Sequence, residues 1–168
     1  MDRPTKGEIR IEDTDISTLN EEALAAFRRR KVGLIYQFFN LIPTLNVEEN
    51  ITLPCELDGQ TVDKKRLDKL IDELGLNGRK THLPEELSGG QQQRVSIGRA
   101  LINRPAIVLA DEPTGNLDKK NSDEIVELLR RANQEYRQTI IMITHNLEIA
   151  KTADRVIVIE DGKIIREG

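Results

Sequence analysis

The apolar and polar positions of this 168-residue chain change their spacing along its length. Residues 8–12 alternate between apolar and polar, which predicts a half-buried strand. Residues 20–30 begin with Asn and two acids and end in basic residues, which favours a helix. From Leu67 to Leu74 apolar side chains recur at helical spacing, and Gly75 follows as a terminator. We therefore predict helices in these two segments, and mostly helix over residues 47–87.

The second half of the chain has a different pattern of apolar residues. Three continuous aliphatic runs are typical of parallel strands buried on both faces: residues 107–109, 140–143 and 156–159. A helix is predicted between Ser88 and Asn103, and apolar stripes predict two more over residues 125–132 and 147–153. Together with a short apolar strand at residues 32–36, this alternation predicts an α/β fold with a mostly parallel sheet.

Composition narrows the class of protein further. Lys and Arg total 25 and Asp and Glu 29, so the net charge is −4 and favours no nucleic acid or anionic surface. The longest apolar runs are far shorter than the roughly 18 residues that a membrane helix needs, and the first residues lack a secretory pattern. Cys55 is the sole cysteine, which agrees with a reducing cytoplasm. We expect one domain with an aliphatic core.

Two acids, Asp111 and Glu112, follow the first buried strand directly. Ligands of open α/β sheets bind at the carboxyl ends of the strands. Because neighbouring strand residues point in opposite directions, one carboxylate can hold Mg²⁺ while the other polarises a water, as phosphoryl transfer requires. Taken alone, the pair could also simply end a strand.

A second candidate lies at Ser88–Gly89–Gly90–Gln91, where a hydroxyl N-cap and two glycines open a helix. The free N–H groups of such a helix start favour an anion. An ordinary serine-capped helix explains Ser88. It does not explain two consecutive glycines, each of which weakens a helix by about 1 kcal/mol.

Three motifs together resemble the ATP-binding subunit of an ABC transporter: LSGGQQQR at residues 87–94, IVLADEPTGNLD at 107–118 and ITH at 143–145. The resemblance implies ATP and Mg²⁺ as ligands and assigns the motifs as follows. The signature motif is Ser88, Gly89, Gly90 and Gln91, and the D-loop is Asn116, Leu117 and Asp118. Asp111 is the Walker B magnesium ligand, and Glu112 is the catalytic base. His145 is the switch histidine, and Gln37 is the Q-loop glutamine, which senses nucleotide and metal.

His145 shows how the motifs support one another. A lone histidine after an apolar strand is more often a satisfied core or loop residue. Its place after Thr144, downstream of the two acids, favours the catalytic reading instead. Asn146 stands where the family usually has an acid, a change that we expect to leave the switch intact.

The resemblance also implies a fold and a branch. The fold is the P-loop NTPase-like ABC ATPase, with a core of about residues 1–46 and 88–168 and a small helical subdomain of about 47–87. The opening residues 2–5 and 7–9, the stretch 36–54 and the GNLD form of the D-loop resemble the lipoprotein-release and macrolide-export branch.

That branch implies two partners. One is a second ATPase subunit in a nucleotide-sandwich dimer, and the other is a membrane permease that docks in the groove between the Q-loop and the helical subdomain. Four apolar residues would lie near this groove, or would alternatively pack the subdomain: Phe38, Phe39, Leu41 and Ile42. The expected location is cytoplasmic, on the cytoplasmic face of the membrane, with no nucleic acid partner.

One family motif does not occur in the sequence. No G-x-x-x-x-G-K-S/T stretch is present, and the one Gly-Lys pair, Gly162–Lys163, has no glycine-rich loop before it. We therefore expect an N-terminally truncated cassette without its N-terminal strands and P-loop strand, the result of a truncated gene, a misassigned start codon or a deliberate truncation. The sheet would then have a gap between residues 139–144 and 155–159, or these strands would pair non-natively, and the chain would be a marginal monomer or would depend on another chain.

Two other functions compete with this expectation. The first is a non-hydrolysing partner module that donates its LSGGQ motif to an intact ATPase. The second is half of a chromosome-maintenance or DNA-repair ATPase, which the short stretch between Gln37 and Ser88 disfavours because it lacks sustained heptads. In each case the isolated chain is expected to bind ATP weakly and not to turn it over.

Overall fold

The structure is a computed structural model that describes residues 4–168, so Asp2 and Arg3 of the branch-like opening lie outside it. The N-terminal elements are β1 (Arg10–Ile11), β2 (Thr14–Asp15), η1 (Ile16–Thr18), α1 (Glu21–Lys31) and β3 (Val32–Ile35). The middle holds α2 (Val47–Leu57), α3 (Lys64–Glu73), η2 (Asn77–Arg79), η3 (Pro84–Glu86) and α4 (Gly89–Leu101). Then follow β4 (Ile107–Asp111), α5 (Lys119–Tyr136), β5 (Thr139–Ile143), α6 (Leu147–Ala150), β6 (Ile157–Glu160) and β7 (Lys163–Glu167).

The helices begin where capping residues predict. Asn20 accepts the Ala23 N–H at 2.8 Å at the start of α1, and Asn46 forms a capping box with Glu49 at the start of α2. The predicted strand over residues 8–12 is shorter than expected, because only Arg10 and Ile11 pair, antiparallel with β2.

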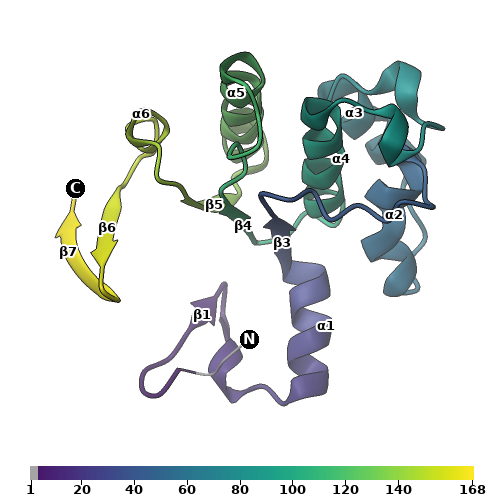
Figure 1. Cartoon of the computed structure of the whole chain (residues 1–168). Coiled ribbons are helices and arrows are strands. Elements are labelled where there is room, and N and C mark those ends of the chain that lie inside the picture. The colour runs from purple at the N-terminus through teal and green to yellow at the C-terminus, as the bar shows by residue number, and fades with distance from the viewer. Residues whose placement is uncertain (1–3) are drawn as a thin grey trace.

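A three-stranded parallel sheet in the order β3–β4–β5 forms the centre of the molecule (Figure 1). Helices α4 and α5 pack on one of its faces, and α2 packs against the outer side of α4. The buried residues Ile35, Val108 and Ala110 point toward these helices, and Ile140 and Met142 are half-buried against the same core. That residues 47–87 form a subdomain of their own stays a prediction.

Close approach at two glycines brings α4 into this central place. A Cβ on Gly33 of β3 would lie 2.6 Å from the carbonyl oxygen of Ala100, and a Cβ on Gly98 would lie 2.7 Å from Leu74 Cδ1. Real Cβ atoms do not come so near, so at Gly33 only glycine lets β3 reach the backbone of α4, and at Gly98 a larger residue would force the Leu74 side chain to move.

The opposite face of the sheet is not covered in the same way. Leu34, Leu109 and Ile141 lie side by side in one row of the register, pointing away from α4 and α5. Exposure rises across the sheet, since Leu34 and Leu109 are half-buried whereas Ile141 and Ile143 of β5 are 50% and 61% exposed. Two predictions were therefore wrong: β5 is buried on one face rather than both, and β6 does not join the parallel sheet.

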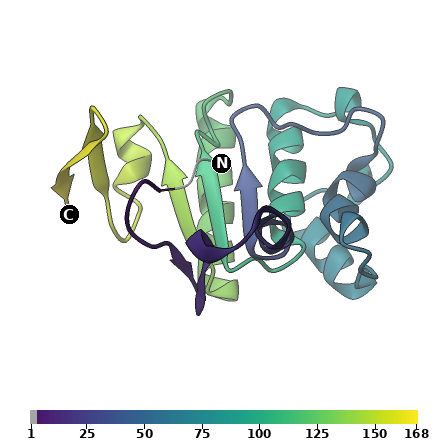
Figure 2. The same ribbon diagram turned by 90° about the horizontal axis from the view of Figure 1, so that it is seen from below.

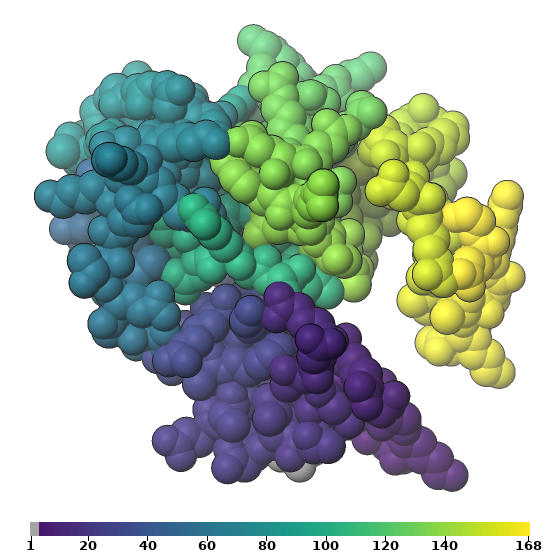
Figure 3. All heavy atoms as spheres, turned by 180° about the vertical axis from the view of Figure 1, so that it is seen from behind, coloured from purple at the N-terminus to yellow at the C-terminus, as the bar shows by residue number. Residues whose placement is uncertain are grey.

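The gap expected beside β5 is present. Within residues 4–168, β5 pairs only with β4, and β6 pairs only with β7, in an antiparallel hairpin (Figure 2). In the space-filling view this hairpin projects from the body of the molecule (Figure 3). No described strand lies between β5 and β6 to bury both, which is why the aliphatic residues of β6 stay exposed. No helix in the described part is long and apolar enough to cross a membrane.

We expect the exposed isoleucines of β5 to make the isolated chain self-associate as its concentration rises, because apolar strands at an open sheet edge pair with other chains. The double substitution Ile141→Lys and Ile143→Lys should suppress association in sedimentation experiments. It should change the free energy of unfolding by only about 0.5 kcal/mol, since both side chains are largely in water.

Leu57→Lys is the matched control, because Leu57 is 65% exposed but lies on α2, away from the sheet. Equal suppression by Leu57→Lys, or a chain that stays monomeric at every concentration, would contradict this prediction.

Candidate functional site

The two predicted acids lie at the carboxyl end of the middle strand. Asp111 is the last residue of β4 and its side chain is exposed. Glu112 follows with a φ of 44°, a left-handed conformation that costs free energy for any residue other than glycine. Its N–H donates to the carbonyl of Ile143 at 2.9 Å, so Glu112 is held beside the end of β5.

Glu112 and His145, the two predicted catalytic residues, are in direct contact. Glu112 Oε1 accepts the backbone N–H of His145 at 2.9 Å and lies 2.7 Å from its Nδ1. Thr144 Oγ1 donates to Oε2 at 3.4 Å. An ionised carboxylate only accepts hydrogen bonds, so Nδ1 carries the proton that lies in this contact, and Nε2 does not take part in it. The imidazole is 82% exposed, and its outer edge is therefore open to a ligand.

The predicted signature residues form the N-terminus of α4. Ser88 Oγ accepts the Gln91 N–H at 3.3 Å, and Gln91 Oε1 accepts the Ser88 N–H at 2.9 Å, which completes a capping box. A Cβ on Gly90 would lie 2.3 Å from Asn121 Oδ1 of α5. A side chain at Gly90 would therefore force Asn121 to move, while Ser88 and Gly89 are exposed and remain accessible.

The Q-loop and D-loop residues meet each other. Gln37 Nε2 donates to Asn116 Oδ1 at 3.4 Å, and Asn116 Nδ2 donates to the Gln37 carbonyl at 3.1 Å. Leu117 reaches toward Gly89. Asp118 caps α5 by accepting the backbone N–H of Asn121 at 2.9 Å and its Nδ2 at 2.7 Å, and these bonds lower the pKa of the Asp118 carboxyl.

The predicted residues thus form two groups rather than one. In residues 4–168, no hydrogen bond or ion pair joins Ser88 or Gln91 to Glu112 or His145. The described side chains also contain no group of three His, Cys, Asp or Glu residues that could hold a metal alone. The arrangement can orient a water or a phosphate at the carboxyl end of β4, but it needs further groups to enclose one.

The four apolar residues predicted near a permease groove divide between the two possibilities. Phe38 and Ile42 are 70% and 40% exposed, whereas Leu41 packs against the core and Phe39 is half-buried. Exposed Phe38 and Ile42 are therefore the two available to a partner.

Three residues near the site were missed by sequence reasoning. Gln93 is fully buried beneath the turn that follows Glu112, and Arg99 of α4 donates to the carbonyls of Phe39 and Asn40. Burial lowers the pKa of Arg99. Asn121 connects α5 to the signature turn. Only Gln93 had a usable signal, since it lies one helical turn before Ile97 on the same face.

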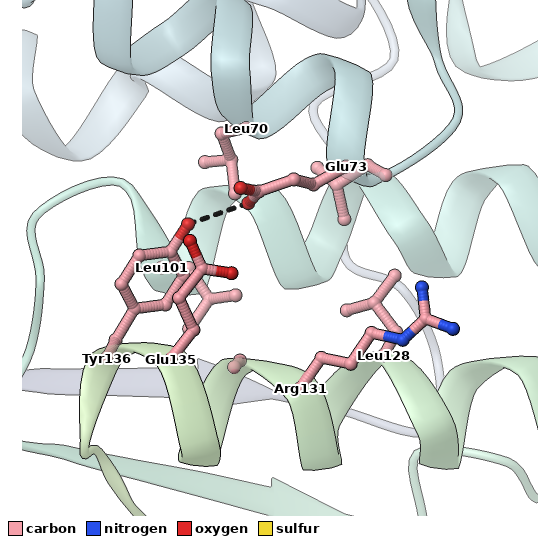
Figure 4. A pocket seen from close by; sticks show the side chains of 9 residues that line it. Leu70, Glu73, Leu101, Leu128, Arg131, Glu135 and Tyr136 are labelled. Carbon is pink, nitrogen blue, oxygen red and sulfur yellow. Dashed lines mark hydrogen bonds between the residues drawn. The ribbon is translucent and has the colours of Figure 1, made fainter.

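One hollow lies away from these residues. A cavity of about 170 Å³ opens between α3, α4 and α5, and the Tyr136 hydroxyl donates to Glu73 across it at 2.7 Å (Figure 4). None of the predicted site residues lines this cavity. It therefore does not mark the chemistry at the sheet.

An acid pair at the end of the middle strand of a parallel sheet, with a histidine against the second acid, is an arrangement suited to phosphoryl transfer. Comparisons with known proteins identify its family. Residues 1–115 match the protein family described as ABC transporter. The chain therefore belongs to the ABC transporter family of ATP-binding proteins, in which ATP hydrolysis is coupled to transport.

Two of its relatives differ in how much of their length the chain spans. The chain is 44% identical over 167 residues to the lipoprotein-releasing system ATP-binding protein LolD of Cytophaga hutchinsonii, spanning 98% of this chain and 76% of that protein. It is 46% identical over 169 residues to the macrolide export ATP-binding/permease protein MacB of Brucella melitensis, spanning 99% of this chain and only 26% of that protein. These relatives support an ATP-binding subunit of the LolD and MacB type.

A solved structure has the same fold. The dimeric post-hydrolysis state of the ATP-binding cassette MJ0796 bound to ADP and Pi superposes with a TM-score of 0.86 at 39% identity. The match covers 99% of this chain and 75% of the solved one. The predicted ABC ATPase fold is therefore confirmed.

The cap at Asp118 gives a test of the local structure. Asp118→Ala should lower the urea midpoint of unfolding, because α5 loses its N-cap, whereas Asp118→Asn should change it little. Because the pKa of Asp118 is lowered in the folded chain, its stabilisation is present above the ordinary value of 3.8 and is lost as pH falls through the lowered pKa.

The difference between the natural chain and Asp118→Ala should therefore stay constant near neutral pH and shrink as pH falls below 3.8 and through the lowered pKa. An unchanged difference over that interval would show that the carboxylate charge does not support the cap.

Proposed function

We propose that this chain acts as the ATP-binding and ATP-hydrolysing subunit of an ABC transporter that powers export or lipoprotein release through a membrane permease. The contact between Glu112 and His145 at the carboxyl end of β4 is the observation that carries the proposal. Such a carboxylate, held by two N–H donors and a hydroxyl, is fixed in position to accept a proton from an attacking water.

The other predicted residues take complementary roles. Glu112 is the general base, and His145 presents its exposed outer ring edge to the γ-phosphate, where Nε2 donates a hydrogen bond once both ring nitrogens carry a proton. Asp111 and Gln37 hold Mg²⁺, which would neutralise phosphate charge. One exposed carboxylate suits this ion, because Mg²⁺ is usually bound through one or two carboxylates with waters and phosphates. Ser88, Gly89, Gly90, Gln91 and Asp118 bind nucleotide held by the second subunit.

The location follows from the partners. The permease docks on the exposed Phe38 and Ile42, between the Q-loop and α2, and holds the subunit at the cytoplasmic face of the membrane. The core of about residues 1–46 and 88–168 carries the chemistry. The subdomain of about residues 47–87 transmits its motion to the permease.

The 168 residues contain no phosphate loop, so we expect them to bind ATP too weakly to saturate in a calorimetric titration and to show no turnover. The loop normally supplies the backbone donors, the lysine and the metal-binding hydroxyl. Micromolar binding by the isolated 168 residues would show that another part of the chain encloses the phosphates.

A second candidate function is a non-hydrolysing partner that donates its signature motif to an intact ATPase. The exposed Ser88 and Gly89 favour it, because the capping box of α4 holds this helix start in place at the surface. Mixed with a full-length LolD relative and a slowly hydrolysed ATP analogue, the chain should form heterodimers on size exclusion.

Ser88→Arg should abolish these heterodimers. Asp63→Arg is the matched control, since it also replaces an N-cap, that of α3, and leaves the signature intact. Hydrolysis by the mixture that Glu112→Gln in this chain reduces supports the first function. Hydrolysis that is unaffected by that change supports the second.

A further inference from the structure

Gln93 is a polar side chain with no exposed surface, in the second turn of α4. Its Nε2 donates to the carbonyl of Pro113 at 2.7 Å and lies 3.4 Å from the carbonyl of Tyr36. Its Oε1 has no hydrogen-bond partner in the described part of the chain. A buried amide with an unpaired oxygen costs free energy, so Gln93 is not explained by packing alone.

The two carbonyls that Gln93 holds are next to the proposed chemistry. Pro113 follows Glu112, whose backbone is left-handed, and Tyr36 precedes Gln37. In the described turn after Glu112, proline has no N–H, and the backbone bonds run from the Gly115 N–H to the Glu112 carbonyl at 3.0 Å and from the Leu117 N–H to the Thr114 carbonyl at 3.1 Å. The amide of Gln93 adds a bond to the Pro113 carbonyl. One side-chain amide therefore connects the signature helix to both strand ends.

We propose that Gln93 is a positioning residue that sets the orientation of Glu112 and Gln37 and transmits displacements of α4 to both. A helix that moved relative to the sheet would have to carry the two carbonyls with it or lose both contacts. This inference rests on the proposed function for the roles of Glu112 and Gln37. Its test needs no nucleotide, so the two can fail separately.

The backbone N–H of His145 is a direct reporter of the Glu112 carboxylate, because it donates to Oε1 at 2.9 Å. Gln93→Met keeps the side-chain length and removes the donor. In ¹H–¹⁵N spectra of the full chain, we expect the His145 amide proton to shift upfield and to exchange with solvent about tenfold faster. The Asn116 side-chain amide should shift as well, since it donates to the Gln37 carbonyl.

The chain provides a closely matched control in Gln138. This glutamine is also buried, donates from Nε2 to a proline carbonyl, that of Pro105, at 2.9 Å, and has an unpaired Oε1 among residues 4–168. Pro105 precedes β4, at the opposite end of the strand from Glu112. Gln138→Met should lower stability about as much as Gln93→Met and leave the His145 amide unchanged.

Two results would overturn the proposal. One is an unchanged His145 resonance and exchange rate in Gln93→Met, and the other is an equal change in Gln138→Met. Should Gln93→Met not fold, Gln93→Asn retains the amide but withdraws it by one methylene, and we expect a smaller shift of the same His145 resonance. No shift in Gln93→Asn would count equally against the proposal.

Discussion

The packing of α4 between the sheet and α2 is the constraint on which the rest of the molecule depends. Gly33 lets β3 reach the Ala100 carbonyl, and Gly98 lets Leu74 and Ile51 reach the helix from the other side. With α4 fixed from both sides, its N-terminus presents Ser88 at the surface while its interior side chains support the strand ends. A side chain at Gly33 would collide with the backbone of α4 and displace the helix, whereas a side chain at Gly98 would force the Leu74 and Ile51 side chains to move.

Contacts at the carboxyl edge of the sheet link the functional motifs of one chain. Glu112 is held by His145, and Gln37 and Asn116 bind each other. Gly90 packs against Asn121, which in turn holds Asp118. At the surface these contacts are hydrogen bonds between polar side chains, and beneath the surface they are close packing contacts. A change at one motif therefore has a direct physical route to the others.

One face of the sheet is largely exposed to solvent, unlike the face that α4 and α5 cover. A parallel sheet normally has helices on both faces because its strands are aliphatic on both. Here α4 and α5 cover one face, while Ile141 and Ile143 on the other remain largely in water and β6 stands apart with β7. The described residues thus hold Glu112 and His145 on a sheet that has one largely open face.

The sequence alone determined the elements whose signals are local. Capping residues and apolar spacing located α1 and α3–α5, and the acid pair after an aliphatic run located Asp111 and Glu112 at a strand end. Only the tertiary structure decided which strands pair. Residues 156–159 have the apolar pattern of a central strand, but that pattern does not determine which strand lies beside them. The sequence likewise did not reveal the contacts of Gln93, Arg99 and Asn121. Their partners lie about 20 to 60 residues away in the chain, and a contact at that separation produces no periodic pattern of residues in the sequence.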